Sequence, residues 1–400
     1  MFRITALVFT LFIPLISCAQ KLTESYYRAN AAIHYKDYEL ANIWIDSAIN
    51  SSPRNPLFWL KKGEIQFQSN HFDEAITSLN MAEKYRVGIA SYWLAKSYAM
   101  KSDTANAFAE LKRHLTSSPK EVEAKILLDT AFNSIKAFHQ WKKLWLENWY
   151  SPSELLVADI DYLFSRFEWD HALDILNEKM EGKKSRHQLF ALRGEAYFNV
   201  GSFKAAEEDF AQALAKSRRN HSYMAWRAKA LMAVSKHGKA IKYLNNAIDL
   251  SGGEPQYYYL RSIAFAGNKE YIKAVDDIRY YLSFYPQDMI AIASFAEYLM
   301  EAGKTIDALF QLGKLIKEHP FDPKFYSMRA KIYMKSSNWE MAEIDLNKTL
   351  SLNPSIAEAF LNRGICKHNL GKSSEACSDW KQAIKLGNFQ AQEFVYKNCR

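Results

Sequence analysis

Apolar and polar residues follow one another along most of the chain with the spacing of amphipathic helices, in short segments that come in pairs. Residues 194–217, GEAYFNVGSFKAAEEDFAQALAKS, show the pattern: two apolar-periodic segments separated by a turn at Gly201. Small residues on the facing sides of the two segments allow two helices to pack closely, and aromatic residues fill the space toward the next pair. The pattern therefore predicts an all-α protein built from helix–turn–helix units.

The helix–turn–helix unit recurs at a fixed period. One alanine per unit lies 34 residues after the last, at Ala172, Ala206, Ala240, Ala274, Ala308, Ala342 and Ala376. Within the unit at 194–217, the characteristic positions are Gly194, Tyr197, Gly201, Phe203, Ala206, Phe210 and Ala213. The period and these residue types resemble the tetratricopeptide repeat family. The resemblance implies a right-handed superhelical solenoid of about eleven repeats, because a single helix pair cannot bury both of its faces.

Changes in the repeat register divide the chain into segments. Less regular repeats precede the regular ones, and the register breaks between them, although the break has room for two helices, at 122–135 and in the stretch QWKKLWLENWY at 140–150. A last amphipathic segment resembles the family's capping helix, which covers the exposed face of the final repeat. The expected divisions are 22–121 (N-terminal repeats), 122–152 (degenerate repeat), 153–388 (regular repeats) and 389–400 (C-terminal cap).

Three tryptophans in the register break lie four residues apart, at Trp141, Trp145 and Trp149. On a helix this spacing places all three on one face. Two interpretations stay open. The tryptophans either pack inward at a kink between two runs of repeats, or stand partly exposed as anchors for a partner protein.

The first nineteen residues have the form of an export signal, with Arg3 before an apolar run at 4–16 that is too short to span a bilayer. Two processing routes are compatible with the residues after this run. The residues before Cys18 resemble a bacterial lipobox, in which that cysteine is acylated, whereas Ala19 before Gln20 resembles an ordinary cleavage site. We expect a lipoprotein of the cell envelope that faces the periplasm, rather than a soluble periplasmic or secreted protein.

A polar pattern accompanies the regular repeats. Four arginines at the seventh repeat position are each followed sixteen residues later by an aspartate: Arg193 and Asp209, Arg261 and Asp277, Arg329 and Asp345, Arg363 and Asp379. If the two positions face each other on paired helices, the guanidinium forks onto the carboxylate. We expect internal ion pairs that fix the helix register, and the alternative is a ladder of charges that binds a ligand.

Two cysteines near the C-terminus are candidates for a disulfide. Cys377 lies ten residues before the turn at Gly387, and Cys399 lies twelve residues after it. Antiparallel helices therefore place them at a similar height, and an exported chain meets an oxidising compartment. The alternative is that each cysteine is simply a small buried residue.

Catalytic motifs are absent from the sequence. It contains no G-x-S-x-G, no phosphate-binding glycine loop, no H-E-x-x-H and no C-x-x-C, so we expect neither an enzyme nor a metal or cofactor site. The formal charge of +8 is spread among interleaved acidic and basic residues, which does not favour nucleic-acid binding.

The family resemblance implies where a ligand would bind. The first helix of each repeat lines the concave face, and the candidate protein-binding residues there are Phe164, Phe198, Met232, Tyr259, Met300 and Met334. We therefore predict a non-catalytic scaffold of the bacterial cell envelope that binds a protein partner. The alternative is a periplasmic binding protein for an extended polymer, a glycan or a lipid chain.

Overall fold

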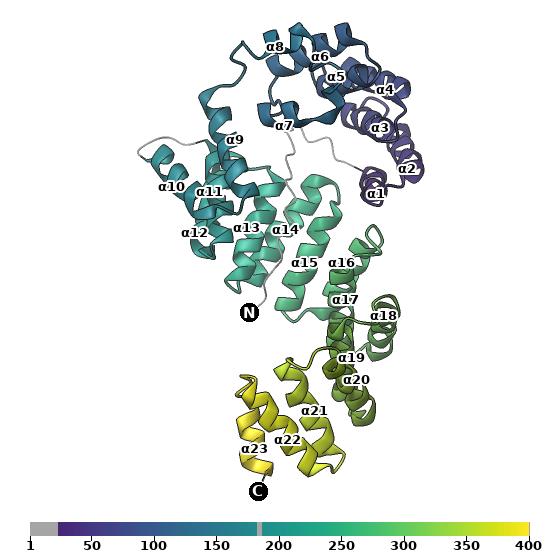
Figure 1. Ribbon diagram of the computed structural model, residues 1–400, viewed down its shortest axis with the longest axis vertical. Coiled ribbons are helices and arrows are strands. Elements are labelled where there is room, and N and C mark those ends of the chain that lie inside the picture. Colours follow the sequence, from purple (N-terminus) through teal and green to yellow (C-terminus); the bar gives the residue numbers. More distant parts are fainter. Residues whose placement is uncertain (1–22, 182–185, 400) are drawn as a thin grey trace. The chain divides into compact units, whose positions relative to one another are not determined.

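The computed structural model describes residues 23–181 and 186–399. Within these ranges the chain forms 23 α-helices and one short 3-10 helix and contains no strand, so the predicted all-α fold is confirmed (Figure 1). The chain divides into two compact units, one ending at Leu260 and one beginning at Arg261, with the boundary inside α15 (Pro255–Gly267). The predicted export signal and Cys18 lie outside the described residues.

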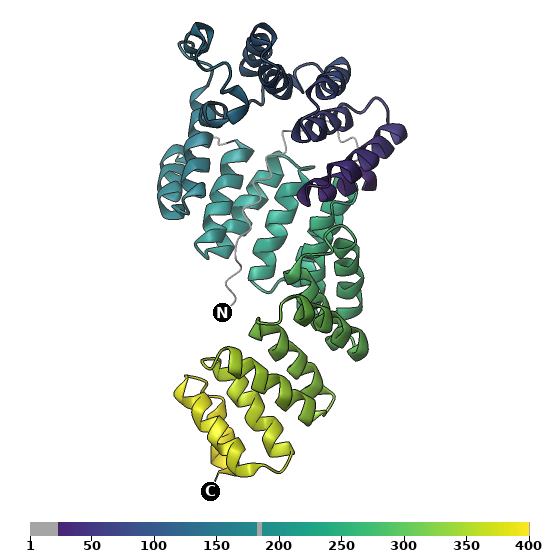
Figure 2. The same ribbon diagram turned by 45° about the vertical axis from the view of Figure 1, so that its right-hand side comes forward.

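Unit 1 contains the helices up to the first half of α15. They are α1 (Glu24–His34), α2 (Tyr38–Ser51), α3 (Pro56–Gln68), α4 (Phe72–Tyr85), α5 (Ser91–Met100), α6 (Thr104–Thr116), α7 (Glu123–Leu128), η1 (Thr130–Phe132), α8 (His139–Leu144), α9 (Pro152–Ser165), α10 (Trp169–Met180), α11 (His187–Asn199), α12 (Phe203–Lys216), α13 (His221–Ala233) and α14 (His237–Ser251). From α1 to α6 and again from α9 to α14, successive helices pack as antiparallel pairs, and each pair packs on the next (Figure 2).

Unit 2 continues with the same helix pairs. Its helices after α15 are α16 (Tyr271–Leu282), α17 (Met289–Glu301), α18 (Thr305–Glu318), α19 (Pro323–Lys335), α20 (Trp339–Leu352), α21 (Ala357–Asn369), α22 (Ser373–Lys385) and α23 (Ala391–Asn398). From α16 onward each helix packs against the next one in the chain.

Close packing inside the pairs follows from the small residues of the repeat. The seven alanines that define the period are completely buried. A Cβ atom added at Gly194 would lie 3.1 Å from the ring of Phe210, and one added at Gly364 would overlap the indole of Trp380. The two helices of a pair therefore approach until one side chain fills the space that the glycine leaves open.

The turn inside each pair uses one backbone conformation. The fifteenth repeat residue has a positive φ in ten pairs, at Lys36, Asn70, Ser102, Phe167, Gly201, Ser235, Lys269, Gly303, Ser337 and Gly371. Only three of these ten are glycine, the residue that adopts this conformation without steric cost. Most repeats therefore accept strain at the turn in exchange for helix packing.

Each of the two segments predicted to be helical in the register break contains an α-helix, but both helices are much shorter than predicted. In 122–135 the α-helix α7 ends at Leu128 and is followed by the 3-10 helix η1, which Asp129 caps by accepting a hydrogen bond from the amide of Ala131. The same carboxylate accepts a hydrogen bond from the hydroxyl of Tyr92. The tryptophan stretch is helical only in α8, which ends at Leu144, so Trp145 and Trp149 do not continue the helix face of Trp141.

Irregular backbone in this segment is held by tertiary contacts. Trp141 is buried against the ring of Phe132, with 5.8 Å between ring centroids. Trp145 packs edge-on against Trp141, and the indole N–H of Trp149 donates to the carbonyl of Leu144 at 2.8 Å. All three tryptophans contact the core formed with α5 and α6. The geometry favours inward packing over a surface anchor.

A disulfide ties the final helix to the last repeat. Cys377 in α22 and Cys399 after α23 are bonded, with Cα atoms 5.6 Å apart, and Phe394 of α23 stacks on the buried Trp380 at 5.2 Å between ring centroids. The remaining described cysteine, Cys366, is buried, which raises the pKa of its thiol to about 12. Helix α23 thus lies where a capping helix is expected.

Unit 1 also contains a contact between elements far apart in sequence. The hydroxyl of Tyr27 in α1 donates to the carbonyl of Ser251 at the end of α14, at 2.8 Å, and both residues are buried. Burial also raises the pKa of Glu254, which follows this helix, to about 7. The first helix of unit 1 therefore packs against the end of its last complete pair.

Candidate protein-binding surface

The first helices of the pairs carry the residues predicted to meet a ligand. We define the inner face as positions five, nine and twelve of these helices, counted from residue 153 in α9 and at 34-residue intervals thereafter. The predicted binding residues lie one to a helix: Phe164 in α9, Phe198 in α11, Met232 in α13, Tyr259 in α15, Met300 in α17 and Met334 in α19. Each unit therefore has its own stretch of inner face.

The two phenylalanines among the predicted binding residues pack against other aromatic rings of the fold. Phe164 is buried against Trp169, with ring centroids 4.8 Å apart. Phe198 is partly buried between Phe203 and Trp226, at 5.3 and 5.7 Å. These rings join the two helices of a pair or two adjacent pairs, so they leave little surface for a ligand. Met232, Tyr259, Met300 and Met334 are partly buried, so each keeps some exposed surface.

A row of charged residues at position nine was missed in the sequence, because the interpretation relied on positions five and twelve. Asp161 in α9, Glu195 in α11 and Lys229 in α13 lie on three consecutive first helices and are all partly buried. Reading the ninth position of each repeat would have found them. They place two carboxylates and one ammonium group on the inner face of unit 1.

The pKa values of all three groups in this row are shifted from their ordinary values. Burial raises the pKa of Asp161 to about 6. Burial also raises the pKa of Glu195, to about 7; the nearby Lys229 opposes the shift and Asp161 adds to it. Burial lowers the pKa of Lys229, whose Nζ lies 4.0 Å from the ring centroid of Trp226. The environment therefore disfavours all three charges.

Charged residues of the same face in the first three pairs have partners within the fold. Lys61 forms an ion pair with Glu64 at 2.5 Å in α3. Lys96 in α5 lies 2.9 Å from the carboxylate of Asp129 and 4.3 Å from the ring centroid of Trp93. Ion pairs within the fold therefore neutralise these charged side chains of α3 and α5, unlike the row on α9, α11 and α13.

The four arginine–aspartate pairs predicted from the sequence are formed. Each arginine donates through Nε and one terminal nitrogen to both oxygens of its aspartate, at 2.7–2.8 Å: Arg193 to Asp209, Arg261 to Asp277, Arg329 to Asp345 and Arg363 to Asp379. The aspartates are buried, at 2–7% exposure. Because both carboxylate oxygens are engaged between the helices of one pair, this geometry favours a structural role over a ligand-binding ladder.

A fifth arginine, at the same repeat position, has a different partner. Arg227 lacks the aspartate, since Tyr243 occupies that position. Its guanidinium instead pairs with Glu207 of the preceding pair at 2.5 Å and lies 4.6 Å from the ring centroid of Tyr243. This ion pair joins two repeats rather than the two helices of one repeat.

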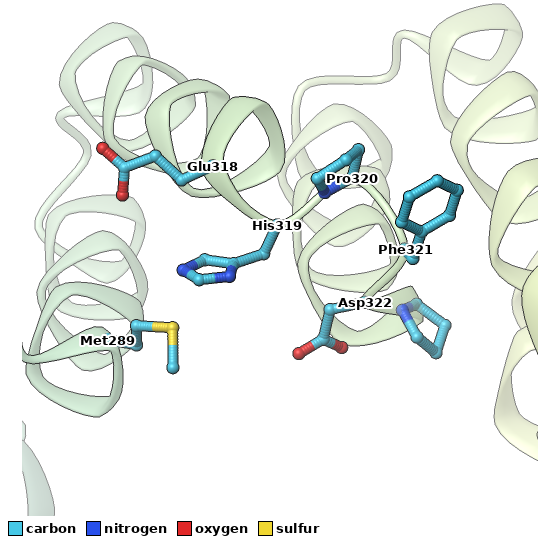
Figure 3. A pocket seen from close by; sticks show the side chains of 7 residues that line it. Met289, Glu318, His319, Pro320, Phe321 and Asp322 are labelled. Carbon is cyan, nitrogen blue, oxygen red and sulfur yellow. The ribbon is translucent and has the colours of Figure 1, made fainter.

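Unit 2 has an open hollow beside the connection from α18 to α19 (Figure 3). Its lining includes Met289, His319, Phe321 and Asp322. The carboxylate of Asp322 accepts from the amide of Lys324 and so caps α19, which leaves it a structural task. The hollow results from the shape of the connection and brings together no catalytic arrangement.

A metal site and a membrane-spanning helix are two features that the described residues do not form. No group of three histidine, cysteine, aspartate or glutamate side chains there is placed to hold a metal ion. No helix in the described ranges is both long enough and apolar enough to cross a membrane.

Comparisons with known proteins agree with the repeat geometry. The tetratricopeptide repeat family matches residues 60–122 and 192–255. The SGT1 homolog of Bos taurus is 31% identical over 108 residues, which are 27% of this chain and 32% of the relative. A TPR repeat-containing protein of Methanocaldococcus jannaschii is 21% identical over 89% of this chain and 62% of its own length. This chain thus spans about a third of the cattle protein.

A solved structure supports the fold itself. The crystal structure of a tetratricopeptide repeat protein from Parabacteroides merdae superposes with a TM-score of 0.51 and 19% identity, and it covers 62% of this chain and 98% of its own. At that identity the likeness concerns the fold alone. The 34-residue period, the helix pairs and the matched segments together make this chain a tetratricopeptide-repeat protein.

Proposed function

We propose that this protein is a non-catalytic scaffold of the bacterial cell envelope that holds a protein partner on the inner face of its helix pairs. Tetratricopeptide-repeat proteins generally mediate protein–protein interaction, and a solenoid supplies a long surface without an enclosed reaction site. The observation that carries the proposal is the inner face itself, where Met232, Met300 and Met334 remain partly exposed next to polar residues. Flexible thioether side chains adapt to a bound peptide.

The envelope location rests on the N-terminal sequence. An export signal followed by Cys18 favours a chain that is acylated at that cysteine and attached to a membrane by lipid. In a bacterial host, the wild-type protein should partition into the detergent phase, and Cys18→Ser should release it into the aqueous phase. A mature wild-type protein that starts at Gln20 and stays aqueous would contradict the lipid anchor.

Partner binding is tested by purification from envelope fractions. The bait is the full chain, and the test variant is Met300→Gln/Met334→Gln on the inner face of α17 and α19. Met341→Gln on α20, where the side chain is exposed, is the matched control. We expect the inner-face variant to lose proteins that wild type and control retain, with all three showing the same circular dichroism.

Two other results would contradict the proposal. Retention of the same proteins by all three baits would exclude the inner face of α17 and α19 as the binding surface. Specific retention of purified glycan or lipid in place of protein would favour the polymer-binding alternative.

A further inference from the structure

The charged row on α9, α11 and α13 has two carboxyl groups that no described side chain pairs with. Asp161 and Glu195 make no side-chain hydrogen bond or ion pair with any described residue. Other acidic groups of the same face, such as Glu64, form ion pairs. Within the described ranges, these two partly buried carboxyl groups therefore have no hydrogen-bonded or ion-paired side-chain partner.

Lys229 compensates the carboxylate of Glu195 only in part, because burial raises the pKa of that group more than Lys229 lowers it. Its ammonium group lies over the ring of Trp226, and its nearest influence on the row is a long-range attraction to Glu195 rather than an ion pair. A cation over an indole face is already stabilised. The two carboxylates thus remain available to a positive group that enters the inner face from outside.

A partly buried carboxylate attracts a cation more strongly than an exposed one. Water screens the charge less where the environment is partly protein, so a charge-assisted hydrogen bond formed there is stronger. Two such carboxylates on adjacent helices suit a guanidinium, which presents several N–H groups in one plane, and also a lysine ammonium. Met232, at position twelve of α13, is partly exposed and offers apolar surface next to them.

We infer that the partner segment held on α9, α11 and α13 presents an arginine or lysine to Asp161 and Glu195, with an apolar neighbour against Met232. This inference rests on the proposed function, since it names the chemistry of the segment that the inner face binds. It predicts a basic, not an acidic, recognition motif for this stretch of the solenoid.

The test is selection from a random dodecapeptide library displayed on phage, with the full chain as the target. Three targets are compared: wild type, Asp161→Asn/Glu195→Gln, and the matched control Asp170→Asn/Glu208→Gln. The control removes the same charge from exposed positions on α10 and α12, the second helices of the same two pairs. We expect wild type and control to enrich arginine and lysine next to an apolar residue, and the test variant to lose that enrichment.

Affinities of the selected peptides sharpen the result. In fluorescence anisotropy at low salt, the test variant should bind the best peptide at least tenfold more weakly than wild type and control, and added salt should weaken wild-type binding. A second measurement needs no variant protein: replacing the basic residue of the peptide by glutamine should weaken binding to wild type by a similar factor. It keeps the inference testable should the double variant fail to fold.

The failures of the inference and of the proposed function differ. Peptides that bind wild type, lose affinity on Met232→Ala, and carry no basic preference would overturn the inference and leave inner-face binding intact. The absence of any peptide whose affinity depends on an inner-face residue would overturn both.

Discussion

At the scale of single residues, the arginine–aspartate pairs show how a buried charge is held in this fold. Asp345 is 2% exposed and accepts two hydrogen bonds from Arg329. Asp345→Ala would leave a guanidinium without its partner, so we expect a loss of roughly 3 kcal/mol in the free energy of unfolding, measured in urea. Arg329→Leu/Asp345→Leu should recover much of the loss. An unchanged unfolding midpoint for Asp345→Ala would contradict the structural role.

The inner-face carboxylates predict the opposite response to neutralisation. Burial raises the pKa of Asp161 to about 6 and of Glu195 to about 7, above the values of the unfolded chain. The folded state therefore binds more protons than the unfolded state between about pH 4 and 7, so stability falls as pH rises through that window. Above it, both groups are charged and destabilise the fold.

Asp161→Asn/Glu195→Gln should accordingly stabilise the protein at pH 8, by roughly 1–2 kcal/mol. Near pH 3 the same variant should match wild type, because both carboxyls are then largely neutral in the folded and unfolded states. Thermal unfolding followed by circular dichroism at the two pH values measures the difference. The prediction fails if Asp170→Asn/Glu208→Gln, on exposed positions, gives an equal gain at pH 8.

At the scale of helices, the turn inside each pair sets a local cost that glycine avoids. Gly303 has φ 78°, and an added Cβ there would meet no atom within 4 Å, so Gly303→Ala tests conformation alone. We expect a loss of about 1 kcal/mol. Gly313, in the middle of α18 and also without neighbours within 4 Å, is the matched control, and Gly313→Ala should gain about 0.5–1 kcal/mol. Equal effects of the two substitutions would refute this account.

The helix pairs were predictable wherever the period is regular, because small residues, turn residues and apolar faces recur at fixed positions. The register break was not, since tertiary contacts override the helical pattern there. Asp129 accepts from Tyr92 and lies 2.9 Å from Lys96, contacts that a sequence pattern does not reveal. Ser151 and Glu154 then form a capping box that starts α9 afresh.

The candidate site was predictable only in part. The first helices and the twelfth position were identified, but the rings of Phe164 and Phe198 are taken up by packing against Trp169, Phe203 and Trp226. The exposure of a side chain depends on its neighbours in three dimensions. The charge of Asp161 and Glu195 was visible in the sequence, whereas their lack of a partner required the structure.

At the scale of the whole molecule, the boundary at residues 260 and 261 was invisible in the sequence, since the alanine period continues through it from Ala240 to Ala274. The end of the chain was more predictable. The spacing of Cys377 and Cys399 about the turn at Gly387 predicted that they lie at a similar height on antiparallel helices. The two are bonded, and the disulfide links α23 to the last repeat.

Breaking that bond should loosen the cap and leave the other repeats folded. With both cysteines changed to serine, amide hydrogen exchange should accelerate across 391–398, and the free energy of unfolding should fall by less than the roughly 3 kcal/mol that a loop of this length permits. Cys366→Ser is the comparison, because its thiol forms no disulfide. Unchanged exchange in α23 after loss of the disulfide would show that packing of Phe394 on Trp380 suffices to hold the cap.

The hydrogen bond from Tyr27 to Ser251 cannot form until long after α1 has been synthesised. It joins residues 224 apart in sequence, whereas most helix contacts of unit 1 join consecutive helices. At ordinary rates of translation, roughly ten to fifty seconds separate the synthesis of the two residues. Throughout that interval α14 does not yet cover the side of α1 that carries Tyr27. A chaperone or export factor that binds nascent chains can therefore reach the side of α1 that carries Tyr27 before α14 exists to compete for it.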